Sequence, residues 1–204
     1  MEFRDPLCAF SHLLTAAWAL FVTPFMVRLA RPEPGRKLAV AAFGLSMVLL
    51  FLASGVFHGV PYTAKNDPVE FRFFQRLDQS AIFVLIAGTN TPPLVILVGG
   101  RLGKRLLAGI WGLALIGIGC LWTLPKPPYA VVVGVSLGMG WLGLLPILRY
   151  YRSVGWRAMN WVWIGALLYT AGGICELTNW PWMRAGPVRF GPHEVFHLLC
   201  SAAS

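Results

Sequence analysis

Histidines are the side chains of this 204-residue chain best suited to bind a metal, and there are four: His12, His58, His193 and His197. His193 and His197 are four positions apart, so on a helix they share one face and can bind one ion, which His58 could approach from another helix. Three neutral imidazoles with an open position for water make a catalytic zinc site, where the pKa of water falls to about 7. The spacing alone equally fits interfacial histidines bonded to carbonyls or headgroups.

Asp78 and Ser54 are the candidate catalytic side chains beside these histidines. Asp78 lies just inside an apolar block, where an unpaired carboxylate is costly and is usually functional. It could accept a proton from the water or orient that water. Ser54 precedes His58 by four positions on the same helix face, so it could polarise a substrate carbonyl or hold the water. The alternative for Ser54 is a bond back to the carbonyl of residue 50.

The segment from His193 to His197 also matches H-E-x-x-H, in which two histidines bind zinc and the glutamate is the base of a metalloprotease. A membrane-embedded protease that uses Glu194 is therefore a competing hypothesis, although the sequence has no separate Asp-containing ligand motif. His12 is open to two interpretations. It could contact the site or shuttle protons, or it could be a plain interfacial histidine.

The elements that must position these residues are transmembrane helices. Apolar residues make up 57% of the chain and charged residues 12%, against about 45–50% and about 25% in soluble proteins, so a soluble protein is excluded. Successive apolar blocks are each long enough to cross a hydrocarbon core of about 30 Å. We predict an all-α polytopic membrane protein, with residues 1–204 forming a single domain. Its seven helices are expected at 9–28, 38–60, 77–100, 106–124, 129–148, 159–178 and 190–204.

The alternation of these helices places all four histidines and Asp78 at the end of the bundle that holds the N-terminus, which we call the histidine end. The last block has 15 residues, about 22 Å at about 1.5 Å per residue, so it cannot cross the core. Either the chain is truncated or this helix stops partway. Ten of the 17 lysines and arginines fall at the other end, which by the positive-inside rule would face the cytoplasm.

The formal charge of +9 does not indicate a nucleic-acid partner, because the basic residues are scattered over the loops and form no stripe. Membrane lipids are the expected partners, and the oligomeric state is open. The cysteines, Cys8, Cys120, Cys175 and Cys200, lie in or beside apolar blocks, where a free thiol behaves as a small hydrophobe.

Three segments, residues 53–58 (ASGVFH), 76–89 (RLDQSAIFVLIAGT) and 193–197 (HEVFH), closely resemble the signatures of the hemolysin III family. That family belongs with the progestin and adiponectin receptors and, more distantly, with alkaline ceramidases. Residues 5–12 also resemble its acidic residue followed by Ser/Thr-His.

The resemblance implies a seven-helix bundle with zinc bound by His58, His193 and His197. It also implies that Asp78 contacts the water on the zinc, that Ser54 is the motif serine, and that Glu194 is not a base. In the eukaryotic receptors the zinc end faces the cytoplasm, so resemblance and charge count disagree on orientation.

The function expected from these features is a zinc-dependent hydrolase of a lipid amide or ester, similar to a ceramidase, in the plasma (inner) membrane. The alternative is a non-enzymatic receptor, channel or membrane-homeostasis protein with a structural zinc. A structural ion should be closed off by a fourth protein ligand, for which His12 is the spare histidine.

Overall fold

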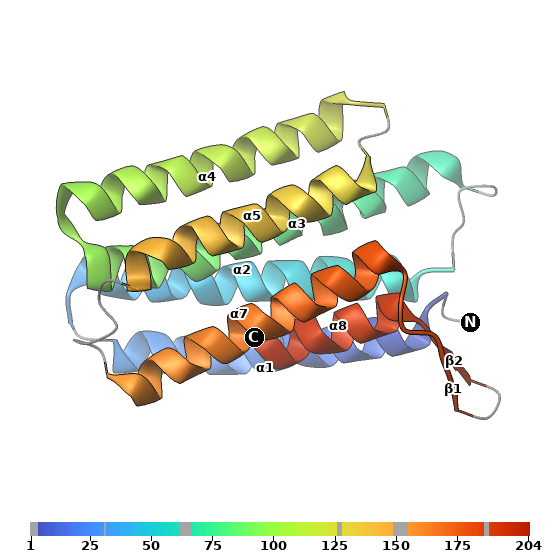
Figure 1. Ribbon diagram of the computed structural model, residues 1–204, viewed down its shortest axis with the longest axis horizontal. Coiled ribbons are helices and arrows are strands. Elements are labelled where there is room, and N and C mark those ends of the chain that lie inside the picture. Colours follow the sequence, from blue (N-terminus) through green and yellow to red (C-terminus); the bar gives the residue numbers. More distant parts are fainter. Residues whose placement is uncertain (1–3, 31, 62–66, 126–127, 149–154, 186–187) are drawn as a thin grey trace.

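The computed structural model describes residues 4–30, 32–61, 67–125, 128–148, 155–185 and 188–204, which form a bundle of helices (Figure 1). The seven α-helices of these ranges are α1 (Pro6–Leu29), α2 (Pro34–Gly59), α3 (Pro68–Pro93), α4 (Gly100–Thr123), α5 (Tyr129–Leu148), α7 (Trp156–Thr178) and α8 (Pro192–Ala203). A π-helical segment, η1 (Leu94–Val98), follows α3, and a small hairpin of β1 (Met183–Ala185) and β2 (Val188–Phe190) joins α7 to α8. The predicted all-α fold is confirmed.

The outer surface of the bundle is apolar. Among the described residues, four helices are long and apolar enough to cross a membrane: α1, α2, α3 together with η1, and α4. Large side chains such as Leu14 and Phe21 on α1 and Trp161 on α7 are each about three-quarters exposed. The chain is therefore a membrane protein whose exposed apolar side chains face lipid.

Several helices begin earlier than the apolar blocks predicted. α3 begins at Pro68 instead of residue 77, and α4 at Gly100 instead of residue 106. Proline occupies the first turn of α1, α2, α3 and α8, where its missing N–H costs nothing. The first two turns of α3 contain the charged residues Glu70 and Arg72. A prediction based on blocks of apolar residues therefore starts this helix too late.

Glycines bring α1 and α2 close together. A Cβ on Gly44 would lie 2.2 Å from Thr23 Oγ1, and a Cβ on Gly55 would lie 2.7 Å from Leu13 Cγ, so neither position has room for a larger side chain. The main-chain N–H of Asp5 also donates to the carbonyl of His58 at 3.1 Å. The start of α1 is thereby fixed beside the end of α2.

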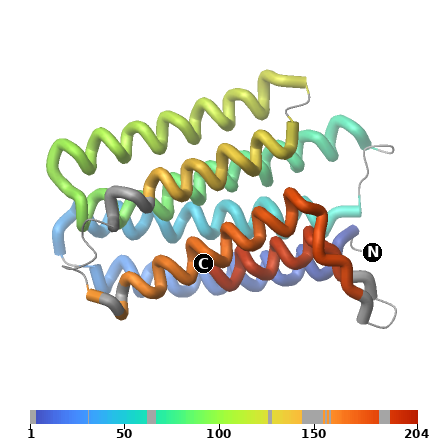
Figure 2. Tube along the Cα trace, viewed as in Figure 1, coloured from blue at the N-terminus to red at the C-terminus, as the bar shows by residue number. Residues whose placement is uncertain are grey.

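α8 completes this end of the bundle. It packs against both α7 and α1, so its first turn lies near the start of α1 and the end of α2 (Figure 2). With 12 residues it is about 18 Å long at about 1.5 Å per residue, which agrees with the expected short last helix. Its final residue lies partway along the bundle in Figure 1.

Cysteine labelling can test the placement of the helix ends. Cysteines introduced at Asp67 and Trp182, which are exposed at the histidine end, should react with a membrane-impermeant maleimide from the same side of the membrane. A cysteine at Glu33, exposed in the α1–α2 connection, should react only from the other side. Labelling of the Asp67 and Trp182 variants from opposite sides would mean that the helices between them are miscounted.

Candidate metal centre

Three histidines from two helices meet at the histidine end. His58 lies in the last turn of α2, and His193 and His197 lie in the first turns of α8. Their ring centroids are 4.6 to 5.0 Å apart, and the Nε2 atoms of His193 and His197 are 3.1 Å apart. The structure thus brings together the three histidines that were predicted from the sequence to be ligands.

Cys8 is a further member of this cluster. One ligand atom from each of Cys8, His58, His193 and His197 can be chosen so that all four lie within 4.8 Å of one another. Cys8 is fully buried in the first turn of α1. From the sequence its thiol was expected to behave as a small hydrophobe, so its position in the cluster is a finding of the structure.

The cluster is compact enough to hold a metal ion. Zn–N distances of about 2.0–2.1 Å and a Zn–S distance of about 2.3 Å place tetrahedral ligand atoms about 3.3–3.6 Å apart, within the spread of this cluster. His58 Nε2 is buried and has no hydrogen-bond partner among the described residues. A buried polar atom without a partner is costly, and coordination of a metal ion would remove that cost. These residues could therefore bind a metal ion.

Each of the three histidines has a polar partner on the outer side of its ring. His58 Nδ1 is 2.9 Å from Asp5 Oδ2, and His193 Nδ1 is 3.2 Å from both carboxylate oxygens of Glu176. His197 Nδ1 is 3.0 Å from a ring nitrogen of His12. Partners of this kind fix the tautomer and orientation of metal-binding imidazoles, and they leave Nε2 directed at the ion.

Asp5 is held as a carboxylate. The hydrogen bond with His58, together with the adjacent Arg4, outweighs the effect of burial and lowers the pKa of Asp5 to about 2. Arg4 donates from Nε to Asp5 at 2.8 Å and stacks over the ring of Phe57 at 4.1 Å. His58 Nδ1 lies 2.9 Å from Asp5 Oδ2, which can only accept, and 2.9 Å from Arg4 Nη2, which can only donate. When its proton is on Nδ1, His58 donates to Asp5 and presents the lone pair of Nε2 to the cluster.

Glu176 is a functional candidate that the sequence analysis missed. Its Oε1 also accepts a hydrogen bond from the hydroxyl of Tyr129 on α5 at 3.0 Å, so α5, α7 and α8 meet at this carboxylate. Glu176 lies inside the block predicted at 159–178, where the rule that singled out Asp78 applies equally.

Asp78 and Ser54 lie beside the cluster. Asp78, half-buried in α3, is within electrostatic range of His58 and His193, and the hydroxyl of Ser54 faces its carboxylate. Ser54 is fully buried, and the alternative bond from its Oγ to the carbonyl of residue 50 is not formed. Their catalytic roles stay a prediction.

Comparison with known proteins shows the family of the chain. The sequence model of the family described as "Haemolysin-III related" matches residues 3–204. The chain belongs to this family. It is 35% identical over 173 residues to "Hemolysin-3" of Bacillus cereus, covering 83% of this chain and 73% of that protein. It is 37% identical over 132 residues to the "Hemolysin-3 homolog" of Bacillus subtilis (strain 168), covering 65% of this chain and 60% of the relative's length.

Glu194 in this haemolysin-III related chain caps its own helix. Its carboxylate accepts a hydrogen bond from the main-chain N–H of Gly191 at 2.8 Å, just before the first turn of α8. Such a bond satisfies one of the free N–H groups at a helix start. The glutamate of the H-E-x-x-H match therefore stabilises the start of α8, which weighs against a role as the base of a protease.

His12 lies behind the cluster. It is buried on α1 one turn beyond Cys8, and its Nε2 is 3.3 Å from the main-chain carbonyl of His197. The ring contacts His197 with a centroid distance of 4.1 Å. Of its two interpretations from sequence, the structure supports contact with the site.

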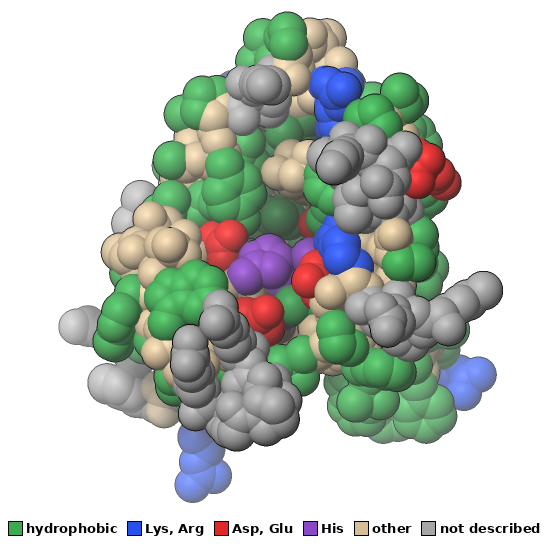
Figure 3. All heavy atoms as spheres, turned by 90° about the vertical axis from the view of Figure 1, so that its right-hand side faces the viewer, with side chains coloured by type: hydrophobic (Ala, Val, Ile, Leu, Met, Phe, Trp, Pro, Cys, Tyr) green, Lys and Arg blue, Asp and Glu red, His purple; other side chains and the backbone are tan. Residues whose placement is uncertain are grey.

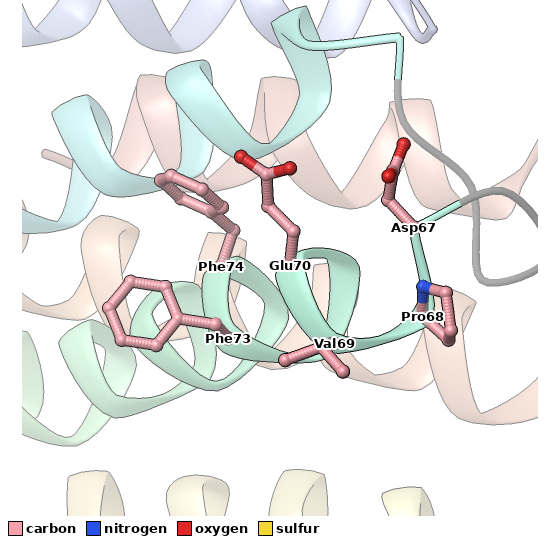
Figure 4. A pocket seen from close by; sticks show the side chains of 6 residues that line it. All are labelled: Asp67, Pro68, Val69, Glu70, Phe73 and Phe74. Carbon is pink, nitrogen blue, oxygen red and sulfur yellow. The ribbon is translucent and has the colours of Figure 1, made fainter.

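The cluster opens to the surface at the histidine end. Figure 3 shows histidine side chains in a hollow, with acidic and basic side chains around it. The side chain of His193 is 40% exposed, whereas those of His58 and His197 are buried. A separate pocket lies at the start of α3 (Figure 4) and contains none of the cluster residues. Its lining residues are Asp67, Pro68, Val69, Glu70, Phe73 and Phe74.

Metal analysis of the purified protein tests the ligand set. We expect about one metal ion per chain, and His58→Ala, His193→Ala and His197→Ala should each lower the occupancy sharply, because each removes a ligand. His12→Ala removes an outer partner of His197 and no ligand, so it should lower the occupancy much less, and Glu33→Gln at the opposite end of the bundle serves as the control. Full occupancy in all three ligand variants would rule out the site.

Asp5 and Glu176, the outer partners that bond to Nδ1 of His58 and His193, should have a smaller effect on metal binding than the ligands do. This effect can be measured as a change in affinity. Asp5→Asn and Glu176→Gln should each weaken metal binding by about 10–100-fold in a chelator competition, because they loosen the orientation of His58 and His193. Glu33→Gln changes an exposed carboxylate at the opposite end and should leave affinity unchanged. Equal affinities for all four proteins would show that these hydrogen bonds do not orient the ligands.

Proposed function

We propose that this protein is a zinc-dependent hydrolase of a lipid amide or ester, similar to a ceramidase, in the plasma (inner) membrane. The observation that carries the proposal is the convergence of His58, His193 and His197 around a buried, unpartnered Nε2. The site lies at the end of a bundle whose outer side chains are apolar, so a lipid headgroup would reach the same depth.

Zinc is the metal that best suits the donor set. Imidazole and thiolate ligands favour zinc over magnesium or calcium, which prefer oxygen ligands. When bound, a zinc ion supplies Lewis-acid activation of water and of a substrate carbonyl.

The side chains of this chain would divide the remaining work. Asp78 accepts the proton released by the attacking water. Ser54 donates a hydrogen bond from its hydroxyl to the substrate carbonyl and keeps its proton. Asp5 and Glu176 hold His58 and His193 in place through Nδ1. The substrate enters laterally from the bilayer.

A second candidate is a non-enzymatic receptor, channel or membrane-homeostasis protein with a structural metal. The observation that favours it is Cys8, because a fourth protein ligand would complete a tetrahedral ion and leave no position for water. The two candidates differ in whether Cys8 can leave the fourth coordination position of the metal ion and make room for water.

Substitution of the two rival carboxylates separates the hydrolase from the protease. Asp78→Asn should retain zinc and lose turnover of the lipid substrate by about 10²–10⁴-fold, the usual scale of general acid–base assistance. Glu194→Gln should cost much less, because an amide oxygen can still accept the hydrogen bond from Gly191. The measurement is the hydrolysis of a panel of lipid amides and esters in vesicles, with zinc content determined on the same samples.

Other outcomes of this experiment point elsewhere. A greater loss in Glu194→Gln than in Asp78→Asn, with cleavage of a peptide substrate, would support a membrane metalloprotease. If neither change affects hydrolysis but both disturb zinc retention, the carboxylates only support the ligands, and the non-enzymatic candidate is preferred.

A further inference from the structure

Cys8 occupies a position at the metal centre that the three histidines do not fill. It lies in the first turn of α1, whereas the histidines come from α2 and α8. Its side chain is fully buried, and its Sγ is part of the four-atom cluster with His58, His193 and His197. The thiol therefore comes from a third helix and supplies a fourth donor, the number that a tetrahedral site takes.

The location of Cys8 is fixed by contacts on both sides of it along α1. On one side, Asp5 is tied to His58 through its main-chain N–H at 3.1 Å and through its carboxylate at 2.9 Å. On the other side, His12 contacts the ring and the main chain of His197. Cys8 lies between these two attachments and is thereby held against the ligand cluster.

We propose that Cys8 is the fourth protein ligand, so that the metal centre is a closed site of one thiolate and three imidazoles in this conformation. His12 is not that ligand, because it lies on the outer side of His197, beside Nδ1, and is not a member of the cluster. Binding of the ion displaces the thiol proton of Cys8 to solvent, since a metal-bound cysteine is a thiolate.

A closed site has a consequence for catalysis that rests on the proposed hydrolase function. A tetrahedral ion with four protein ligands has no position for water or substrate. The protein described here would then be in a resting state, and hydrolysis would begin only once Cys8 leaves the ion. Removal of the thiol should open the same position permanently.

X-ray absorption of the zinc-loaded, full-length protein tests the ligation directly. The wild-type protein should show one sulfur at about 2.3 Å and nitrogen ligands at about 2.0–2.1 Å. Cobalt(II) in place of zinc should show a sulfur-to-cobalt charge-transfer band in the near ultraviolet. Cys8→Ser should lose both signals and weaken zinc binding by at least about 100-fold, the upper end of what an outer partner contributes.

Cys200→Ser is the matched control, because Cys200 is buried on α8 and is not a member of the cluster. It should keep the sulfur signal and the affinity of the wild-type protein. A wild-type spectrum with only nitrogen and oxygen ligands would overturn the proposal, whether or not Cys8→Ser folds. A sulfur signal that persists in a folded Cys8→Ser protein would overturn it as well.

Turnover distinguishes this inference from the proposed function. If the wild-type ion lacks sulfur but the protein hydrolyses a lipid amide or ester, the inference fails and the hydrolase stands. If sulfur is bound but zinc-loaded wild-type and Cys8→Ser proteins hydrolyse no lipid amide or ester, Cys8 is a ligand of a structural metal and the hydrolase fails. A gain of turnover in zinc-loaded Cys8→Ser supports both.

Discussion

The polar residues of the histidine end depend on one constraint, the high cost of leaving a polar group without a partner at the edge of an apolar bundle. The structure meets it by pairing. Asp5 takes hydrogen bonds from Arg4 and His58, Glu176 takes them from Tyr129 and His193, and His12 pairs with His197. Nε2 of His58 is among the buried side-chain atoms that have no hydrogen-bond partner in the described part of the chain, and the histidines around it point to a metal ion as its missing partner.

These pairs also connect helices that are distant in sequence. Asp5 and His58 are 53 positions apart, and His12 and His197 are 185 positions apart, so the pairs hold α1 against both α2 and α8. The close approach at Gly44 and Gly55 serves the same arrangement, because it lets the ends of α1 and α2 meet. Loss of a ligand or of its outer partner should therefore disturb helix packing as well as metal affinity.

The sequence predicted the all-α bundle and the shared location of the histidines, because the length of apolar blocks fixes which helix ends meet. It placed the start of α3 nine positions late, because the helix begins before its apolar block does. Glu176 could have been predicted as a site residue from the sequence, because a carboxylate inside an apolar block usually has a function. Cys8 could not have been predicted, because a membrane cysteine that packs as a hydrophobe and one that binds a metal look alike in sequence.

Charge compensation at this site is shared among several carboxylates. Asp5 and Glu176 are hydrogen-bonded to His58 and His193, and Asp78 and Glu194 also lie within electrostatic range of His193. A divalent ion held by neutral imidazoles would add positive charge near the edge of a hydrocarbon core, where an uncompensated buried charge costs several kcal/mol. These carboxylates, counted against Arg4, offset that charge whether or not Cys8 binds the ion. Displacing a thiolate of Cys8 would then make the centre more positive by one charge, which would stabilise a carbonyl oxygen as it becomes negative during hydrolysis.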